Sequence, residues 1–180
     1  MKATGIVRRI DDLGRIVIPK EIRRTLRIRE GDPLEIFTDR EGKVILKKYS
    51  PIGELGTLAG IYADSLSKTL DCTVCITDTD QVIAAAGNGK KELQEMLLST
   101  ELAEVFQERK TVLKKSSDAE FVAITKDRSE YSEEIISVIL SEGDIAGGVI
   151  LLQKNEKKHF GEMEKKFAAG AADLLGRQLS

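Results

Sequence analysis

The first 50 residues most constrain what this chain folds into, because they predict many short elements and little core. Pro19 is suited to begin a short helix, KEIRRTL, whose Ile22 and Leu26 lie on one side and are predicted to face the core. Four stretches around this helix have the pattern of short strands: ATGIVRRID, GRIVI, LEIFTD and KVILKKY. A unit of about 50 residues without disulfides or metals buries too small a fraction of its surface to be stable alone. The segment is therefore predicted to be an obligate dimer.

Charge is distributed unevenly along the chain. Residues 1–50 contain 13 Lys and Arg against 8 Asp and Glu, whereas the remaining 130 residues contain 15 against 22. The formal net charge of −2 thus hides a basic head on an acidic body. Such asymmetry indicates that one end of the protein binds a polyanion.

Arginine supplies much of the charge of this head. Arg23 and Arg24 lie about 100° apart on the predicted helix, and Arg8 and Arg15 flank a predicted turn at 11–14. Guanidinium groups suit phosphate oxygens because each makes paired hydrogen bonds and supplies charge. The same arginines could instead form ordinary surface salt bridges with nearby carboxylates: Asp11, Asp12, Glu21 and Glu30. The residue pattern alone leaves both interpretations open.

The sequence predicts two domains, 1–50 and 56–180, joined by a short linker at 51–55. The second domain begins with a helix at about 53–70 and ends with a long helix from about 160. Between them lie two short helices and apolar strands that include TVCITDTD, QVIAAAG, TVLKK, FVAITK, ISVILSE and AGGVILLQ. This order predicts an α+β fold with antiparallel neighbours. The apolar stripes of the two long helices either cover their own sheet or also associate with a second copy.

Few residues suggest catalysis. His159 is the only histidine, and no metal-ligand spacing, nucleophile motif or phosphate-binding loop occurs, so we predict no enzyme activity, no cofactor and no metal. Cys72 and Cys75 are three apart in a strand and are predicted to be ordinary residues on opposite faces. Glu133 and Glu134 lie in a polar stretch that predicts a solvated loop.

No apolar run approaches the roughly 20 residues that a membrane span requires, and the N-terminus has no hydrophobic signal core. The expected location is the cytoplasm, without contact with a membrane.

The N-terminal 50 residues resemble the DNA-binding domain of the AbrB family of bacterial transition-state regulators. The elements that carry the resemblance are TGIVR, LGRIVIP and EIRRTL. It implies a swapped-hairpin β-barrel in which two chains interleave, and it implies double-stranded DNA as partner. The family's DNA-facing arginines correspond to Arg8, Arg15, Arg23 and Arg24, and Arg9 occupies a position that is also basic in relatives.

The remaining residues resemble a GAF-type sensory domain in the order of their elements. An AbrB-like head on a GAF-like body implies a nucleoid-associated transcriptional regulator, both activator and repressor, of forespore genes during sporulation. It also implies a homotetramer held by the helices that flank the GAF-like domain. The stretch 155–160 lacks the signature of cyclic-nucleotide GAF domains, so a cyclic nucleotide is not expected as ligand. The domain either binds another small molecule, at residues that stay unknown, or keeps the fold only for assembly. The alternative function is an antitoxin-like module that binds protein through the same barrel.

Overall fold

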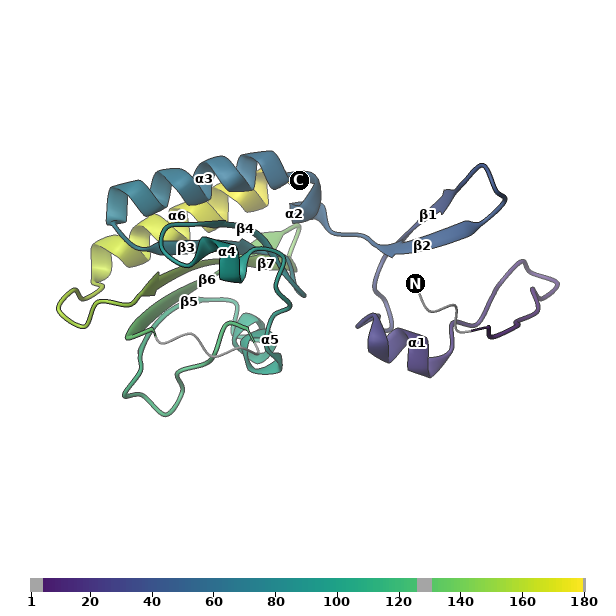
Figure 1. The fold of residues 1–180 in the computed structure, drawn as a ribbon, viewed down its shortest axis with the longest axis horizontal. Helices are drawn as coiled ribbons and strands as arrows, with labels where there is room; N and C mark the ends of the chain where they lie inside the picture. The colour runs from purple at the N-terminus through teal and green to yellow at the C-terminus, as the bar shows by residue number, and fades with distance from the viewer. Residues whose placement is uncertain (1–4, 126–130, 180) are drawn as a thin grey trace. The chain divides into compact units, whose positions relative to one another are not determined.

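The computed structural model describes residues 5–125 and 131–179, and the chain divides into two compact units (Figure 1). The N-terminal unit comprises Met1–Tyr49 and the C-terminal unit Ser50–Ser180. The stretch predicted as a linker contains a short helix, α2 (Pro51–Glu54). The Ser50 hydroxyl caps this helix by accepting a hydrogen bond of 3.0 Å from the backbone N–H of Gly53.

The N-terminal unit consists of one short helix and one hairpin. Helix α1 (Lys20–Thr25) follows Pro19, which is its N-cap and has a φ of −55°. Strands β1 (Leu34–Thr38) and β2 (Val44–Lys48) pair in antiparallel register, as predicted. The described residues of the two earlier stretches predicted as strands, 5–11 and 14–18, join no sheet within one chain, and the described residues close no barrel; Ala3 and Thr4 lie outside the described residues. A single two-stranded hairpin has too few strands to bury its own apolar face.

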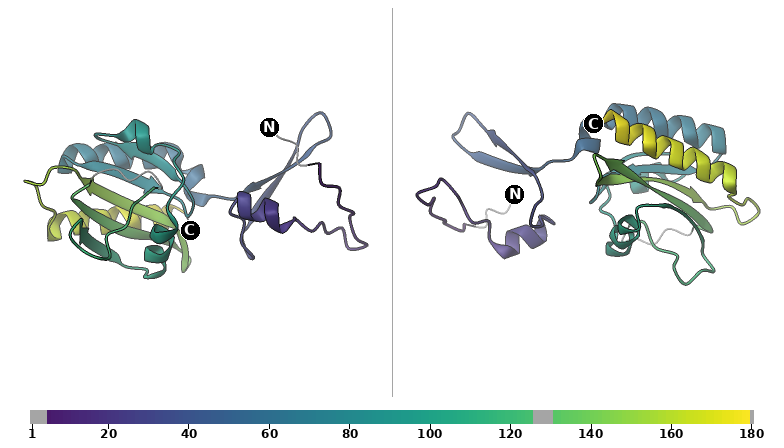
Figure 2. Two further views of the ribbon diagram at one scale, coloured as in Figure 1. Left: turned by 60° about the horizontal axis from the view of Figure 1, so that its bottom comes forward. Right: turned by 180° about the vertical axis from the view of Figure 1, so that it is seen from behind.

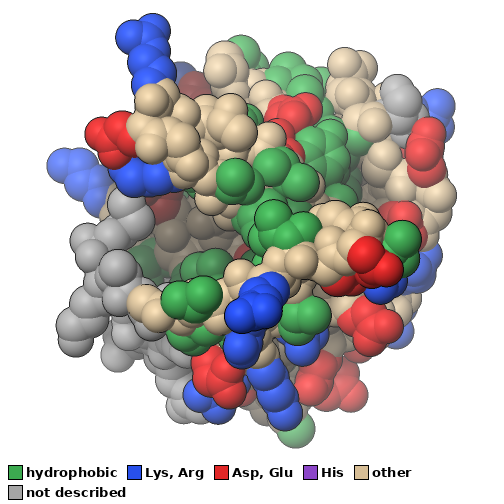
Figure 3. Space-filling model, turned by 90° about the vertical axis from the view of Figure 1, so that its right-hand side faces the viewer, with side chains coloured by type: hydrophobic (Ala, Val, Ile, Leu, Met, Phe, Trp, Pro, Cys, Tyr) green, Lys and Arg blue, Asp and Glu red, His purple; other side chains and the backbone are tan. Residues whose placement is uncertain are grey.

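Most apolar side chains of the N-terminal unit are exposed in a single chain. Figure 3 shows apolar side chains open on the surface among lysines and arginines. Leu26, predicted to face the core, is 55% exposed, and α1 buries no residue. Eleven further large apolar residues are exposed: Ile6, Val7, Ile10, Leu13, Ile16, Val17, Ile36, Phe37, Val44, Ile45 and Leu46. A unit that keeps so much apolar surface in water lacks a core of its own.

The C-terminal unit is built on one antiparallel sheet of five strands in the order β4-β3-β7-β6-β5. The strands are β3 (Thr73–Thr77), β4 (Val82–Ala86), β5 (Thr111–Lys115), β6 (Glu133–Ser141) and β7 (Asp144–Gln153). Each of these five strands coincides largely with a stretch that the sequence predicts as a strand. The prediction of a strand at FVAITK is wrong over its described residues, 121–125, which make only an isolated bridge between Thr125 and Leu98; Lys126 lies outside the described residues. Its apolar residues, Ile124 among them, pack over a face of the sheet instead of lengthening its edge.

Helices cover both faces of this sheet and create two cores. The long helices α3 (Gly56–Leu70) and α6 (Glu162–Gln178) lie side by side on one face (Figures 1 and 2), where Leu175 packs with Ile135 and Leu151. Helices α4 (Lys90–Leu93) and α5 (Thr100–Gln107) contribute to the second core on the opposite face. Within the described ranges, no helix is long and apolar enough to cross a membrane.

Candidate nucleic-acid interface

Arg15 lies at the end of a tight turn that Asp11 organises. The backbone N–H of Asp11 donates to the carbonyl oxygen of Arg15 at 3.1 Å, and Gly14 has a φ of +77°, which glycine adopts without strain. The Asp11 Oδ1 accepts hydrogen bonds from the backbone N–H groups of Leu13 and Arg15 at 3.0 and 2.8 Å. The turn thus fixes the backbone from which the Arg15 side chain projects.

The Asp11 carboxylate also holds the Arg15 side chain. Its Oδ2 accepts a hydrogen bond of 2.8 Å from the Nε of Arg15, whose side chain stays 71% exposed. The backbone and side-chain hydrogen bonds from Arg15 lower the pKa of Asp11 below its usual value. From the sequence, Asp11 was expected only as a possible salt-bridge partner of the arginines. The signal for its double role is its spacing, since Asp11 precedes a left-handed glycine by three residues and an arginine by four.

Helix α1 carries two more of the arginines predicted to bind DNA, Arg23 and Arg24. Arg24 is exposed and Arg23 is half-buried. Their two positions differ because the chain leaves the helix at Leu26 and folds back, so that the Ile28 backbone N–H donates to the Arg23 carbonyl oxygen at 2.8 Å. The two side chains therefore project in different directions from one short helix.

Four of the five predicted arginines have no carboxylate partner within the part of the chain that the structure describes. These are Arg8, Arg9, Arg23 and Arg24, and Arg8 and Arg9 are exposed on the extended stretch before the turn. The proposed salt bridges with Asp12, Glu21 and Glu30 do not form for these four, whereas the pair of Arg15 and Asp11 does. An unpaired guanidinium on an exposed segment keeps its charge and its donors for an anionic partner.

Glu133 and Glu134 are not in a solvated loop, and that prediction is wrong. Both lie in β6, with exposed fractions of 2% and 0%. Glu133 accepts hydrogen bonds from the Phe160 N–H at 2.6 Å and from His159 Nδ1 at 2.8 Å. Burial opposes ionisation of Glu133, but these bonds and the charges of His159 and Lys115 outweigh it and lower its pKa. The strand begins earlier than its polar sequence suggested because hydrogen bonds satisfy this carboxylate.

Glu134 points to the opposite face of the sheet and is only partly satisfied. Its Oε1 accepts a hydrogen bond of 3.1 Å from the Val122 N–H, and its buried Oε2 has no hydrogen-bond partner among the described residues. Burial raises the pKa of Glu134 to about 7, against the lowering effects of the Val122 bond and the Lys114 charge. Lys114, which pairs with Glu134 across the strands, is itself buried.

The two cysteines are ordinary buried residues, as predicted, although Cys72 lies directly before β3 and not in a strand. Both are free and buried, and they belong to cores on opposite faces of the sheet. Burial raises the pKa of each thiol to about 12, so neither is a reactive thiolate at neutral pH. No group of three or more potential metal ligands occurs in residues 5–125 and 131–179.

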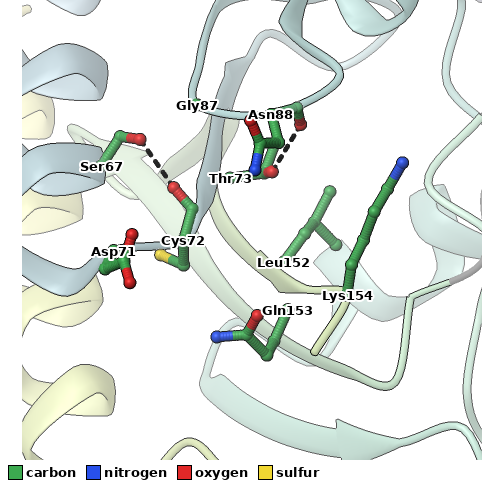
Figure 4. Close-up of a pocket in the computed structure, with 9 residues that line it drawn as sticks. All are labelled: Ser67, Asp71, Cys72, Thr73, Gly87, Asn88, Leu152, Gln153 and Lys154. Carbon is green, nitrogen blue, oxygen red and sulfur yellow. Dashed lines mark hydrogen bonds between the residues drawn. The ribbon is translucent and has the colours of Figure 1, made fainter. Parts of the chain in front are cut away.

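A small pocket of about 130 Å³ lies at one end of the five-stranded sheet (Figure 4). Two hydrogen bonds shape its wall: Ser67 Oγ donates to the Cys72 carbonyl at 2.6 Å, and Thr73 Oγ1 to the Asn88 carbonyl at 2.7 Å. The full lining is Ser67, Asp71, Cys72, Thr73, Gly87, Asn88, Leu152, Gln153 and Lys154. A side chain at Gly87 would meet the Cys72 carbonyl at 2.7 Å, so the pocket wall requires glycine there.

Two lining residues of the pocket belong to a row of register partners across the sheet. Thr73 and Leu152 are register partners, Leu152 is paired with Glu134, and Glu134 is paired with Lys114. Neighbouring strands lie about 4.8 Å apart, so Glu134 is one strand from the pocket wall and Lys114 is two. The sequence missed this row, because only the strand register places these residues side by side.

Similarity to known families follows the same division of the chain. Residues 54–180 match the family model described as stage V sporulation protein T C-terminal, transcription factor. Residues 7–54 match the model described as antidote-toxin recognition MazE, bacterial antitoxin.

Individual relatives agree with these matches. The transition state regulatory protein AbrB of Bacillus subtilis (strain 168) is 67% identical over 51 residues, which span 28% of this chain and 52% of AbrB. The GAF domain of an Acinetobacter phosphoenolpyruvate-protein phosphotransferase superposes with a TM-score of 0.59 at 14% identity, covering 74% of this chain and 84% of that one. The first likeness identifies the AbrB-like head, and the second shows a GAF-like fold for the body.

One relative matches the whole chain. Stage V sporulation protein T of Bacillus subtilis (strain 168) is 51% identical over 183 residues, and the alignment covers 99% of both chains. Both units and their order are therefore shared with that protein. The chain belongs to the stage V sporulation protein T family of transcription factors.

Proposed function

We propose that this protein binds double-stranded DNA as a dimer through Arg8, Arg9, Arg15, Arg23 and Arg24. In doing so it would activate some forespore genes and repress others in the cytoplasm of a sporulating cell. It acts as a regulator and not as an enzyme. The relative that matches the whole chain is a sporulation protein, and the AbrB-like head is the part with the basic charge.

One observation carries this proposal. The head displays four arginines without carboxylate partners among the described residues, on a unit whose apolar side chains are also exposed. A second copy that covers the apolar side chains would complete the barrel and gather the arginines of two chains on one body. Such a surface gains affinity by releasing counterions from DNA phosphates.

The test is the salt dependence of DNA binding. Replacing Arg23 or Arg24 by Ala should weaken binding to every duplex tested and flatten the plot of log K against log salt by about one unit per lost contact. Fluorescence anisotropy over a series of salt concentrations measures both effects.

Arg29→Ala is the matched control, because it removes the same charge from an exposed residue of the same unit. It should change the salt slope much less than Arg24→Ala. Equal slopes for the two variants would show that bulk charge, and not these positions, binds DNA. A folded dimer that binds normally after Arg23→Ala or Arg24→Ala would contradict the assignment.

The match of residues 7–54 to an antitoxin model supports one alternative, a module that binds a toxin protein. DNA binding is favoured because the whole-chain relative is a sporulation protein, and because a folded body follows the head. If the protein neutralised a toxin, Arg24→Ala would impair growth of cells that carry the toxin while DNA binding in vitro stayed unchanged.

The C-terminal unit is proposed to join two dimers into a tetramer. Ile61 on α3 and Met163, Phe167 and Leu174 on α6 are at least 40% exposed along the two helices. Helices that bury one side against their sheet have a second side available for a bundle. Linking two DNA-binding faces would raise apparent affinity through effective concentration. Sedimentation of Phe167→Glu should give a dimer, and an unchanged mass would refute this assembly.

A small molecule that modulates the regulator is proposed to bind the C-terminal unit at the pocket beside the Thr73–Leu152 row. This site is supported by the pocket and by the Glu134 Oε2, which lies one strand away and has no hydrogen-bond partner in the described part of the chain. A metabolite that binds there should stabilise the full chain against heat by mass action. A metabolite screened by thermal shift should lose its effect when Asn88→Trp places a bulky side chain in the pocket, since the backbone carbonyl of residue 88 can still accept the hydrogen bond from Thr73. Stabilisation that survives in this variant would place the ligand elsewhere.

A further inference from the structure

The N-terminal unit contains the same turn twice. Residues 11–15 (DDLGR) and 39–43 (DREGK) share the pattern Asp-x-x-Gly-basic. In each turn the Asp N–H donates to the carbonyl oxygen four residues later at 3.1 Å, and the Gly N–H donates to the Asp carbonyl oxygen at 3.1 or 3.2 Å. Both glycines have a left-handed φ, +77° and +80°. The Asp side chain closes both turns, because Asp39 Oδ1 accepts from Glu41 and Lys43 as Asp11 Oδ1 does from Leu13 and Arg15.

The turns differ in what the second carboxylate oxygen does. Asp11 Oδ2 binds the Arg15 guanidinium through Nε at 2.8 Å, whereas Asp39 Oδ2 lies 3.5 Å from the Lys43 ammonium, which also contacts Glu41. Lys43 is thereby neutralised by two carboxylates. Arg15 has a single partner on its Nε edge, and its two Nη groups have no acceptor among the described residues. A guanidinium held in this way presents a fork of two fixed donors.

A guanidinium that is fixed and partly neutralised by a carboxylate is suited to a different kind of DNA contact from one without a carboxylate partner. The nearby carboxylate weakens its attraction for phosphates in general, since the pair carries little net charge. Fixing the side chain in advance removes the entropic cost of ordering it at one chosen acceptor pair. Arg8, Arg9, Arg23 and Arg24 lack such a carboxylate, which suits them to phosphates.

We propose that Asp11 is a positioning residue that makes Arg15 the specificity-determining arginine of the interface. The Nη fork of Arg15 contacts a base edge in the major groove, with guanine O6 and N7 as the fitting acceptors. The other four arginines supply affinity that does not depend on sequence. The inference rests on the proposed DNA binding and assigns different roles within that one surface.

The experiment compares two duplexes with the full-length protein. One is enriched by the wild-type chain from a random-sequence library, and the other is a shuffled duplex of the same composition. In Asp11→Asn the Asn Oδ1 still accepts both backbone N–H groups, but its amide N–H₂ faces the Nε–H donor of Arg15. The turn is retained and the guanidinium is released.

Asp11→Asn should lower the ratio of the two affinities about tenfold, within the range for one bidentate base contact. Binding to the shuffled duplex should stay equal or strengthen, with a salt slope steeper by about one unit, because Arg15 regains an unpaired charge. Arg15→Ala should lower the ratio of the two affinities by the same factor. The double variant should lose no more than Arg15→Ala, since Asp11 acts through Arg15.

Asp39→Asn is the control for the turn itself, because it makes the same change in the same hydrogen-bond network away from the predicted arginines. It should leave the affinity ratio unchanged. If Asp11→Asn has a lower melting temperature than Asp39→Asn, Arg15→Lys is used as the test variant in its place. Lys keeps the charge and the backbone hydrogen bonds but lacks the Nε that binds Asp11. Arg15→Lys should then lose the ratio while keeping the affinity for shuffled DNA.

The outcomes separate this inference from the function on which it rests. A wild-type affinity ratio in Asp11→Asn or Arg15→Lys, together with a reduced ratio in Arg15→Ala, would overturn the positioning role and leave DNA binding intact. Normal binding of both duplexes by Arg15→Ala and Arg24→Ala would instead refute the proposed DNA interface.

Discussion

The two units of this chain bury their apolar side chains in opposite ways. The C-terminal unit has two closed cores, in which Ile135, Ile136, Ile150 and Leu151 are fully buried. The N-terminal unit exposes residues of the same type, for example Ile36 at 69% and Val17 at 74%. Both units have strong alternation in their sequences, so apolar pattern alone does not tell a self-sufficient domain from half of an assembly. The difference is the number of strands and helices that each unit can place over its own apolar face.

The largest effect should come from placing a charge on the exposed apolar face of the N-terminal unit. If a second copy covers this face, Ile36→Glu buries an unpaired carboxylate and abolishes folding of the head together with DNA binding. The C-terminal unit should unfold as in the wild type. Hydrogen exchange of the two units, measured separately in the full chain, distinguishes these responses.

Arg40→Glu is the control, because it places the same carboxylate at the exposed tip of the same hairpin. This variant should keep a folded head. A folded, DNA-binding Ile36→Glu protein would show that the apolar face stays in water, and the contrast between the units would then lose its explanation.

The next effect should come from overfilling the closed unit. A Cβ at Gly176 of α6 would lie 2.1 Å from the Leu140 carbonyl oxygen, so Gly176→Ala forces the helix away from β6. The expected cost is roughly 3 kcal/mol of unfolding free energy. Gly170 in the same helix has no atom within 4 Å of such a Cβ, and Gly170→Ala should stabilise by about 1 kcal/mol. Thermal unfolding that ranks the two variants in the opposite order would contradict this packing.

An effect of similar size, but dependent on pH, should come from Glu134. Its pKa is about 7 in the folded protein against a usual value of 4.5, so folding favours the protonated form. The resulting stabilisation is complete below pH 4.5 and is lost as the pH rises through 7. Relative to Glu134→Gln, the wild type should therefore lose about 3 kcal/mol between pH 4.5 and 7.5. Denaturant unfolding across this range measures the difference.

The pH dependence of stability due to Glu133 should have the opposite sign to that due to Glu134, the next residue of β6. Its pKa is lowered, so its stabilisation is present above the usual pKa and is lost as the pH falls through the folded value. The difference between the wild type and Glu133→Gln should therefore grow with rising pH. Parallel pH profiles for the two variants would show that the two faces of the sheet do not treat these carboxylates differently.

The sequence predicted most elements of the C-terminal unit, because their apolar runs are long and lie between clear turns. It failed where an apolar run could either join the sheet or cover it, as at 121–125, which covers a face instead of joining an edge. It also failed at Glu133 and Glu134, since hydrogen bonds and register, and not residue type, decide whether a carboxylate can be buried. For the candidate DNA interface, the resemblance supplied the five arginines, and their roles in binding stay predictions.

By itself, the sequence determined the two units, their secondary structure in outline and the basic head, because these follow from local pattern and composition. Only the tertiary structure revealed that the head exposes its apolar face, that Asp11 holds Arg15, and that Glu134 is buried with one oxygen unpaired among residues 5–125 and 131–179. Each of these depends on which groups meet in space. Hydrogen-bond partners and burial are set by strand register and by the available covering elements, and neither is encoded in any short stretch of residues.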